Sequence, residues 1–99
     1  MKISNDKFYK IRHVPTGLYK MEGENNEFNK IGKIWRGSRV IAHLKQFKSS
    51  PMRDRKLSIS ELISFWWKKY PLEECEIIEF QMTETNSQNL KDFIKEELE

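Results

Sequence analysis

The sequence predicts an α+β fold: a small antiparallel sheet with helices packed on one face, forming a single two-layer domain over residues 1–99. Segments with alternating polar and apolar residues cluster within residues 7–35 and return at residues 74–84, while stretches with helical spacing lie between and after them. Short consecutive strands joined by a turn pair antiparallel, and helices then cover one side of the sheet. A chain of 99 residues can enclose one hydrophobic core but not two.

The strand predictions follow from side-chain alternation. Residues 7–14 place Tyr9, Ile11 and His13 on one face and the intervening residues on the other. Residues 15–17 (PTG) are typical of a turn, so residues 18–21 form the second strand of a hairpin. After a polar loop at residues 22–26, Phe28 and residues 31–35 indicate a third strand or extended segment.

The helix predictions depend on capping residues and apolar spacing. Ser38 is a good N-cap for a first helix that ends near Lys48. Ser58 and Glu61 form a capping-box pattern, and the helix they begin reaches Tyr70 before Pro71 ends it. Residues 74–84 alternate as a late strand.

A terminal helix is predicted at about residues 87–98, capped by Asn86 or Ser87. Its narrow apolar stripe allows two roles: docking on its own domain or forming the interface of a homo-oligomer. Between the first two helices, residues 49–56 (SSPMRDRK) contain a proline and four charges without periodicity, and we expect a mobile basic loop.

Charge is distributed unevenly along the chain. Residues 1–56 hold fourteen Lys and Arg against five acidic residues, a net of +9, and the remainder carries −6. An anionic partner would therefore meet surfaces built from the first half. Cys75 is the single cysteine, which excludes an internal disulfide and suits a reducing cytoplasm. With neither a long apolar stretch nor a hydrophobic leader pattern, we expect a cytoplasmic protein without a membrane partner.

The sequence does not predict a catalytic centre. His13 and His43 have no cysteine or acidic residue at the spacing that metal ligation or a catalytic triad would show. We therefore expect no metal, no cofactor and no enzymatic activity.

The strongest candidate for ligand binding is the segment that leads into the first helix. Lys33, Arg36 and Arg39 supply cations, Trp35 supplies an indole, and Ser38 stands at the helix start, where backbone amides favour an anion. Two residues of the first predicted strand are added to this set: Tyr9, which could stack on a base, and Arg12. The alternative is that Trp35 packs in the core and the cations are solvated.

A second candidate surface would bind a protein partner. Trp66 and Trp67 are adjacent on a predicted helix and point about 100° apart, so we expect one to be buried and the other to lie at the core edge or an interface. Arg53, Arg55 and Lys56 of the predicted mobile loop could contact an acidic partner, or simply be solvated.

Several segments taken together resemble small uncharacterised accessory proteins of tailed bacteriophages. The residues concerned are Phe8–Arg12, Thr16–Tyr19, Phe28, Lys30, Gly32-Lys33, Trp35, His43-Leu44 and Cys75–Phe80. The resemblance brings no activity with it. It implies the cytoplasm of an infected bacterium, where proteins of this size commonly bind host components, and some sequester nucleotide immune signals.

Two functions therefore stay open. One is a non-enzymatic protein that binds an anionic ligand, either a nucleotide signal or a nucleic acid. The other is an inhibitor or adaptor that binds a host protein.

Overall fold

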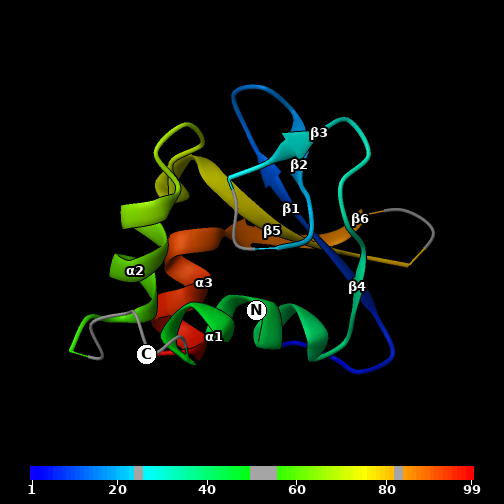
Figure 1. The fold of residues 1–99 in the computed structure, drawn as a ribbon. Helices are drawn as coiled ribbons and strands as arrows, with labels where there is room; N and C mark the ends of the chain where they lie inside the picture. Colours follow the sequence, from blue (N-terminus) through cyan, green and yellow to red (C-terminus); the bar gives the residue numbers. More distant parts are fainter. Residues whose placement is uncertain (24–25, 50–55, 82–83) are drawn as a thin grey trace.

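The computed structural model describes residues 1–23, 26–49, 56–81 and 84–99, and these residues form a six-stranded antiparallel sheet and three α-helices (Figure 1). The strand order is β3-β2-β1-β5-β6, and β4 pairs with the start of β1. The strands are β1 (Phe8–His13), β2 (Leu18–Lys20), β3 (Phe28–Asn29), β4 (Trp35–Arg36), β5 (Cys75–Phe80) and β6 (Glu84–Asn89). The helices are α1 (Arg39–Ser49), α2 (Ile59–Trp66) and α3 (Leu90–Glu97), with a 3-10 turn at Leu72–Glu74. The α+β class with antiparallel strands is thus confirmed.

The core lies between the inner face of the sheet and the helices. Strands β1 and β5 pair over six residues, which brings Tyr9 opposite Glu79, Ile11 opposite Ile77 and His13 opposite Cys75. All six of these side chains are buried, so the predicted inward face of the first strand is correct. Leu44 of α1, Ile63 of α2 and Phe93 of α3 belong to the same apolar cluster, and Figure 1 shows the helices together on one side of the sheet.

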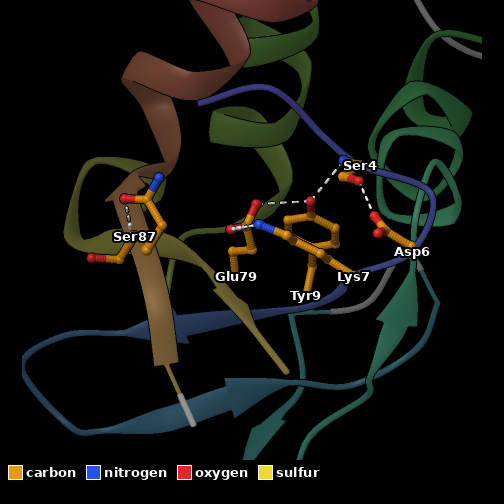
Figure 2. Close-up of polar contacts among 7 residues, drawn as sticks. Ser4, Asp6, Lys7, Tyr9, Glu79 and Ser87 are labelled. Carbon is orange, nitrogen blue, oxygen red and sulfur yellow. Dashed lines mark hydrogen bonds and ion pairs between the residues drawn. The ribbon is translucent and has the colours of Figure 1, made fainter. Parts of the chain in front are cut away.

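Polar contacts inside this layer fix the N-terminal segment (Figure 2). The Tyr9 hydroxyl accepts a hydrogen bond from the Ser4 amide at 2.8 Å and donates one to Glu79 at 3.0 Å. Lys7 Nζ lies 3.2 Å from the other carboxylate oxygen of Glu79. A buried carboxylate is costly unless it is paired, and here two partners from β1 and its approach satisfy it.

The second helix ends four residues earlier than the sequence predicts. The structure begins α2 at the expected capping box, in which Ser58 accepts from the Glu61 amide and Glu61 accepts from the Ser58 amide. However, α2 ends at Trp66 and not at Tyr70. The reason is a competing acceptor: with its carbonyl turned toward the chain, the Asn26 side chain accepts from the amides of residues 68–70 at 3.0–3.2 Å. Those amides are then no longer available to the helical ladder.

Residues 84–89 correct the prediction for the C-terminal region. The expected helix at about 87–98 begins only at Leu90, after the six-residue edge strand β6. Asn89, and not Asn86 or Ser87, caps α3 by accepting from the Asp92 amide at 3.2 Å. Strand β6 (ETNSQN) is polar throughout, so it lacks the apolar alternation by which a strand is predicted. It lies at the edge of the sheet, where polar strands are common. Helix α3 docks on its own domain, burying Leu90, Phe93 and Ile94.

The predicted mobile loop at 49–56 falls largely on residues 50–55, which lie outside the described residues, as do Arg53 and Arg55. In the part of the chain that the structure describes, each helix is too short or too polar to cross a membrane.

The first testable prediction concerns the two adjacent tryptophans. Trp67 is 1% exposed and packs against Phe28 and Phe47, whereas Trp66 is 48% exposed. We expect Trp67→Ala to lower the free energy of unfolding by about 3–5 kcal/mol, because truncating a buried aromatic leaves a cavity. Trp66→Ala should cost less than about 1 kcal/mol. Urea denaturation measures both, and equal losses would contradict this assignment.

Candidate functional site

A tight loop brings the cationic segment next to the first helix. The Asn29 side chain accepts hydrogen bonds from the amides of Ile31 and Gly32, at 2.9 and 2.6 Å, and bends the chain after β3. Gly32 has a φ of +70°, and a Cβ there would stand 2.2 Å from the Cβ of Tyr19. Only glycine fits this close approach. The Lys33 amide then donates to the Lys20 carbonyl at 2.9 Å, which directs the chain toward β4.

Strand β4 and a second glycine set the start of α1. Pairing with β1 places Trp35 opposite Tyr9 on the inner face and leaves Arg36 exposed on the other side. Gly37 has a φ of +59°, and a Cβ there would come within 2.8 Å of the Asn5 backbone. The Ser38 amide donates to the Asn5 side-chain oxygen at 3.3 Å, and α1 begins with the next residue.

These elements border an open cleft of about 630 Å³ beside the first two turns of α1. Its volume is within the range of small-molecule sites. Its walls come from three places: the loop before β3, the approach to β4 with the strand itself, and one face of α1. The lining residues are Glu22, Gly23, Lys33, Ile34, Trp35, Arg36, Arg39, Ala42, His43 and Gln46.

His43 is the most deeply buried polar side chain of the cleft. It is 7% exposed, and its ring stacks on Trp35 with centroids 4.6 Å apart and an interplanar angle of 31°. Burial, together with the smaller effect of the nearby Lys20 charge, lowers the pKa of His43 to about 4. The imidazole is therefore neutral near pH 7.

The two ring nitrogens of His43 differ in their contacts. Nδ1 lies 3.1 Å from the side-chain amide of Gln46, and which of the two groups donates is set by the tautomer of the ring. Nε2 is buried and has no hydrogen-bond partner among the described residues.

Lys20 carries a further positive charge near the cleft, although it does not line it. Lys20 is fully buried, and its Nζ donates to the carbonyls of Met21 and Gly23 at 2.7 and 2.9 Å. Burial lowers the pKa of Lys20 to about 8, so the ammonium form still predominates near neutral pH. Because Gly23 lines the cleft, Lys20 adds to the positive potential on that side of the domain.

The structure brings four of the predicted ligand-binding residues together: Lys33, Trp35, Arg36 and Arg39 all line the cleft. Trp35, however, is 5% exposed and packs in the core, which leaves little of its ring for a base. The alternative interpretation of Trp35 as a core residue therefore fits the structure. His43, Gln46 and Glu22 join the site although the sequence analysis did not include them. His43 follows Arg39 by four residues and thus shares its helix face, which is the signal that could have found it.

The other three predicted ligand-binding residues lie apart from this cleft. Tyr9 is fully buried and hydrogen-bonded to Ser4 and Glu79, so it has no ring face with which to stack on a base. Arg12 points to the opposite face of the sheet, where it pairs with Glu76 and Glu84. Ser38 does not line the cleft, and its amide, which was expected to bind a phosphate, donates to Asn5.

The predicted protein-binding residues also separate. Trp67 is a core residue and cannot contact a partner in this structure, which corrects its assignment to an interface. Trp66 is exposed, as expected for one of the pair, and its ring lies edge-on to Phe65 at 5.7 Å. Phe65 is itself 62% exposed. Lys56 lies at the surface.

One further polar cluster could not be found from the sequence because one member, Glu74, is 61 residues from His13. His13 Nδ1 lies 2.8 Å from Thr16 Oγ1, and His13 Nε2 lies 2.7 Å from a Glu74 oxygen. A hydroxyl, an imidazole and a carboxylate thus stand in the same order as in a catalytic triad. The amides of Gly17 and Leu18 already donate to the His13 carbonyl and to Thr16 Oγ1, so neither could stabilise an oxyanion. The contacts instead hold the β1-β2 turn against the 3-10 turn that precedes β5.

Comparisons with family models, with curated proteins and with solved structures give no match. Within the described ranges, His, Cys, Asp and Glu side chains do not gather in groups of three that could hold a metal ion. Interpretation of the site therefore depends on its own geometry.

The second prediction follows from the burial of His43. Its pKa is about 4 in the folded protein and 6.5 in an unfolded chain, so the unfolded state binds the extra proton between these values. The free energy of unfolding should therefore decrease by up to about 3 kcal/mol as the pH falls from 6.5 toward 4. Urea denaturation across this range, compared with His43→Phe, isolates the contribution, because carboxylates titrate in both proteins. If the free energy of unfolding depends on pH in the same way in both proteins, the predicted contribution of His43 is wrong.

Proposed function

We propose that this protein binds an anionic, phosphate-bearing ligand in the cleft beside α1 and that it acts by binding and not by catalysis. The observation that carries the proposal is the convergence of Lys33, Arg36 and Arg39 on one cleft of ligand size. Three cations at one opening repel each other, and an anion would relieve that repulsion. Sequestration of a nucleotide signal or binding of a nucleic acid are the two forms this function could take.

The charges around the opening support an anion with more than one negative charge. Glu22 lies 3.8 Å from Lys33 Nζ and offsets one of the three cations. Arg36 and Arg39 are exposed, and each guanidinium can hold two phosphate oxygens through parallel hydrogen bonds. The positive charge of buried Lys20 acts from the same side.

The resemblance to tailed-phage accessory proteins is consistent with such a role. A phage protein of this size that captures a host nucleotide would need a cleft and cations, but no catalytic groups. We include this setting, a bacterial cytoplasm during infection, in the proposal.

The third prediction tests the cleft directly. We expect Arg36→Glu and Arg39→Glu each to lower affinity for ATP, single-stranded DNA or RNA by at least about tenfold, because reversal replaces a forked donor with a repelling carboxylate. Isothermal titration calorimetry measures the affinities, and circular dichroism confirms folding.

Lys45→Glu is the matched control. It makes the same change in charge on the same helix, but Lys45 is exposed and does not line the cleft. Equal losses in all three variants would indicate diffuse electrostatics. Parent-like binding by folded Arg36→Glu and Arg39→Glu variants would show that the cleft is not the site.

A second candidate function is the binding of a host protein, for which the exposed ring pair of Phe65 and Trp66 is the specific observation. Large exposed aromatic side chains are frequent interface hot spots. Lys68 Nζ lies 5.3 Å from the Phe65 ring centre, so the partner surface would carry an apolar group flanked by acidic residues.

The fourth prediction separates this function from the first. A Phe65→Ser, Trp66→Ser double variant should keep its fold, because both rings are exposed, and should lose any protein that co-purifies with the parent from bacterial cells. Nucleotide affinity should stay unchanged. Mass spectrometry of the purified material identifies the protein lost, and retention of the same partners by the double variant would exclude this surface.

A further inference from the structure

We propose that the ligand in the cleft beside α1 is a nucleotide and that its sugar or base packs against the exposed side chain of Ile34. This inference rests on the anion-binding function proposed above and deepens it. The three cations of the cleft hold the phosphates, and Ile34 recognises the part of the ligand that carries no charge. The nucleotide could be free or be one unit of a single-stranded nucleic acid, because both present the same chemical groups.

Ile34 is an apolar side chain that stands in solvent among the cations of the cleft. It is 46% exposed and lines the cleft together with Lys33, Arg36 and Arg39. Of the large hydrophobic side chains exposed in the described part of the chain, Ile34 alone lines this cleft. A single exposed isoleucine needs no explanation elsewhere on a surface, but beside forked cations it offers a ligand a second kind of contact. The cleft therefore matches a ligand in which a partly apolar group adjoins the phosphates.

The fold holds Ile34 in this exposed position. On one side of it, the Lys33 amide donates to the Lys20 carbonyl at 2.9 Å, and on the other, Trp35 pairs with β1. Adjacent side chains of an extended segment point to opposite sides, and Trp35 is the one that turns into the core. The geometry that buries Trp35 thus keeps Ile34 in solvent, so a ligand can reach Ile34 without a rearrangement of the chain.

The other apolar lining residues offer a ligand less than Ile34 does. Trp35 and His43 are 5% and 7% exposed, and their rings stack on each other with centroids 4.6 Å apart. A base could therefore not stack on either ring without a change in the packed core. Ala42 is exposed on α1 but supplies a single methyl group. Ile34 is thus the large apolar side chain of the cleft that a sugar or base can cover.

The contribution expected from this contact follows from the exposed fraction of Ile34. Full burial of an aliphatic side chain changes an equilibrium constant by roughly ten- to a hundredfold. A ligand that covers the exposed 46% of Ile34 gains the corresponding share of that free energy. This share amounts to about fivefold in affinity.

The test is a calorimetric comparison of Ile34→Ser with the parent protein. The ligands are ATP, GTP, CTP and UTP, an oligonucleotide of mixed sequence, and inorganic tripolyphosphate, which has phosphates but neither sugar nor base. Ile34→Ser should lower affinity for at least one nucleoside triphosphate about fivefold and affinity for tripolyphosphate less than about twofold. Whichever of that triphosphate and the oligonucleotide the parent binds more tightly at the same salt concentration identifies the source of the nucleotide, and Ile34→Ser should weaken its binding.

Ile31→Ser is the matched control. Ile31 is 76% exposed but does not line the cleft, so the same change of side chain there should alter each affinity by less than about twofold. Circular dichroism confirms that both variants fold, as expected for substitutions at exposed positions.

The outcomes separate this inference from the function on which it rests. If only tripolyphosphate binds the parent, or if folded Ile34→Ser binds every nucleotide at least as tightly as the parent does, the inference fails while anion binding stands. The inference also fails if Ile34→Ser weakens tripolyphosphate as much as the nucleotides, or if Ile31→Ser causes the same loss, because the effect is then not a contact between Ile34 and a nucleoside. If neither tripolyphosphate nor any nucleotide binds the parent, the anion-binding function itself is wrong.

Discussion

The pairing of β1 with β5 is the constraint on which the rest of this structure depends. The two strands pair over six residues at the centre of the sheet, and β1 also pairs with β2 at its end and with β4 at its start. The same pairing supplies partners for the polar atoms that β1 buries. Tyr9 reaches Glu79, and His13 reaches Glu74 next to the start of β5. A shift of one residue in this register would turn both polar side chains and the apolar Ile11 to the outer face.

The buried polar groups of the core differ in how completely their hydrogen-bonding atoms are satisfied. Glu79, His13 and Lys20 are each held by at least two polar partners, which offset their loss of hydration. His43 has only one of its two ring nitrogens satisfied among the described residues, and it lies at the cleft. Trp67 Nε1 is also without a partner in that part of the chain, but Trp67 is enclosed by the core and does not line the cleft. Of these two residues, only His43 lines the cleft.

The cleft and the exposed aromatic pair are independent surfaces. Helix α1 forms one wall of the cleft with the face that carries Arg39 and His43, and buries Leu44 and Phe47 with another. Phe65 and Trp66 lie at the end of α2 and do not line the cleft. Helix α2 ends there because Asn26 takes the amides of residues 68–70, so the two aromatic side chains occupy its last turn. A substitution at one surface leaves the other unchanged, and the proposed anion-binding and protein-binding functions can be tested separately.

Local sequence pattern determined several secondary-structure elements and the cations of the cleft. Neighbouring residues were enough to predict the alternation in β1 and β5, the capping box at Ser58 and the start of α1. Most of the cleft lies within residues 33–46, so its cations could also be chosen from the sequence. Only the tertiary structure decided the rest. It buried Trp35, Tyr9 and Trp67, bound the Ser38 amide to Asn5, ended α2 early and made a strand of the polar residues 84–89. Each of these outcomes depends on a partner distant in the chain, and periodicity reports only which residues share a face, not what that face meets.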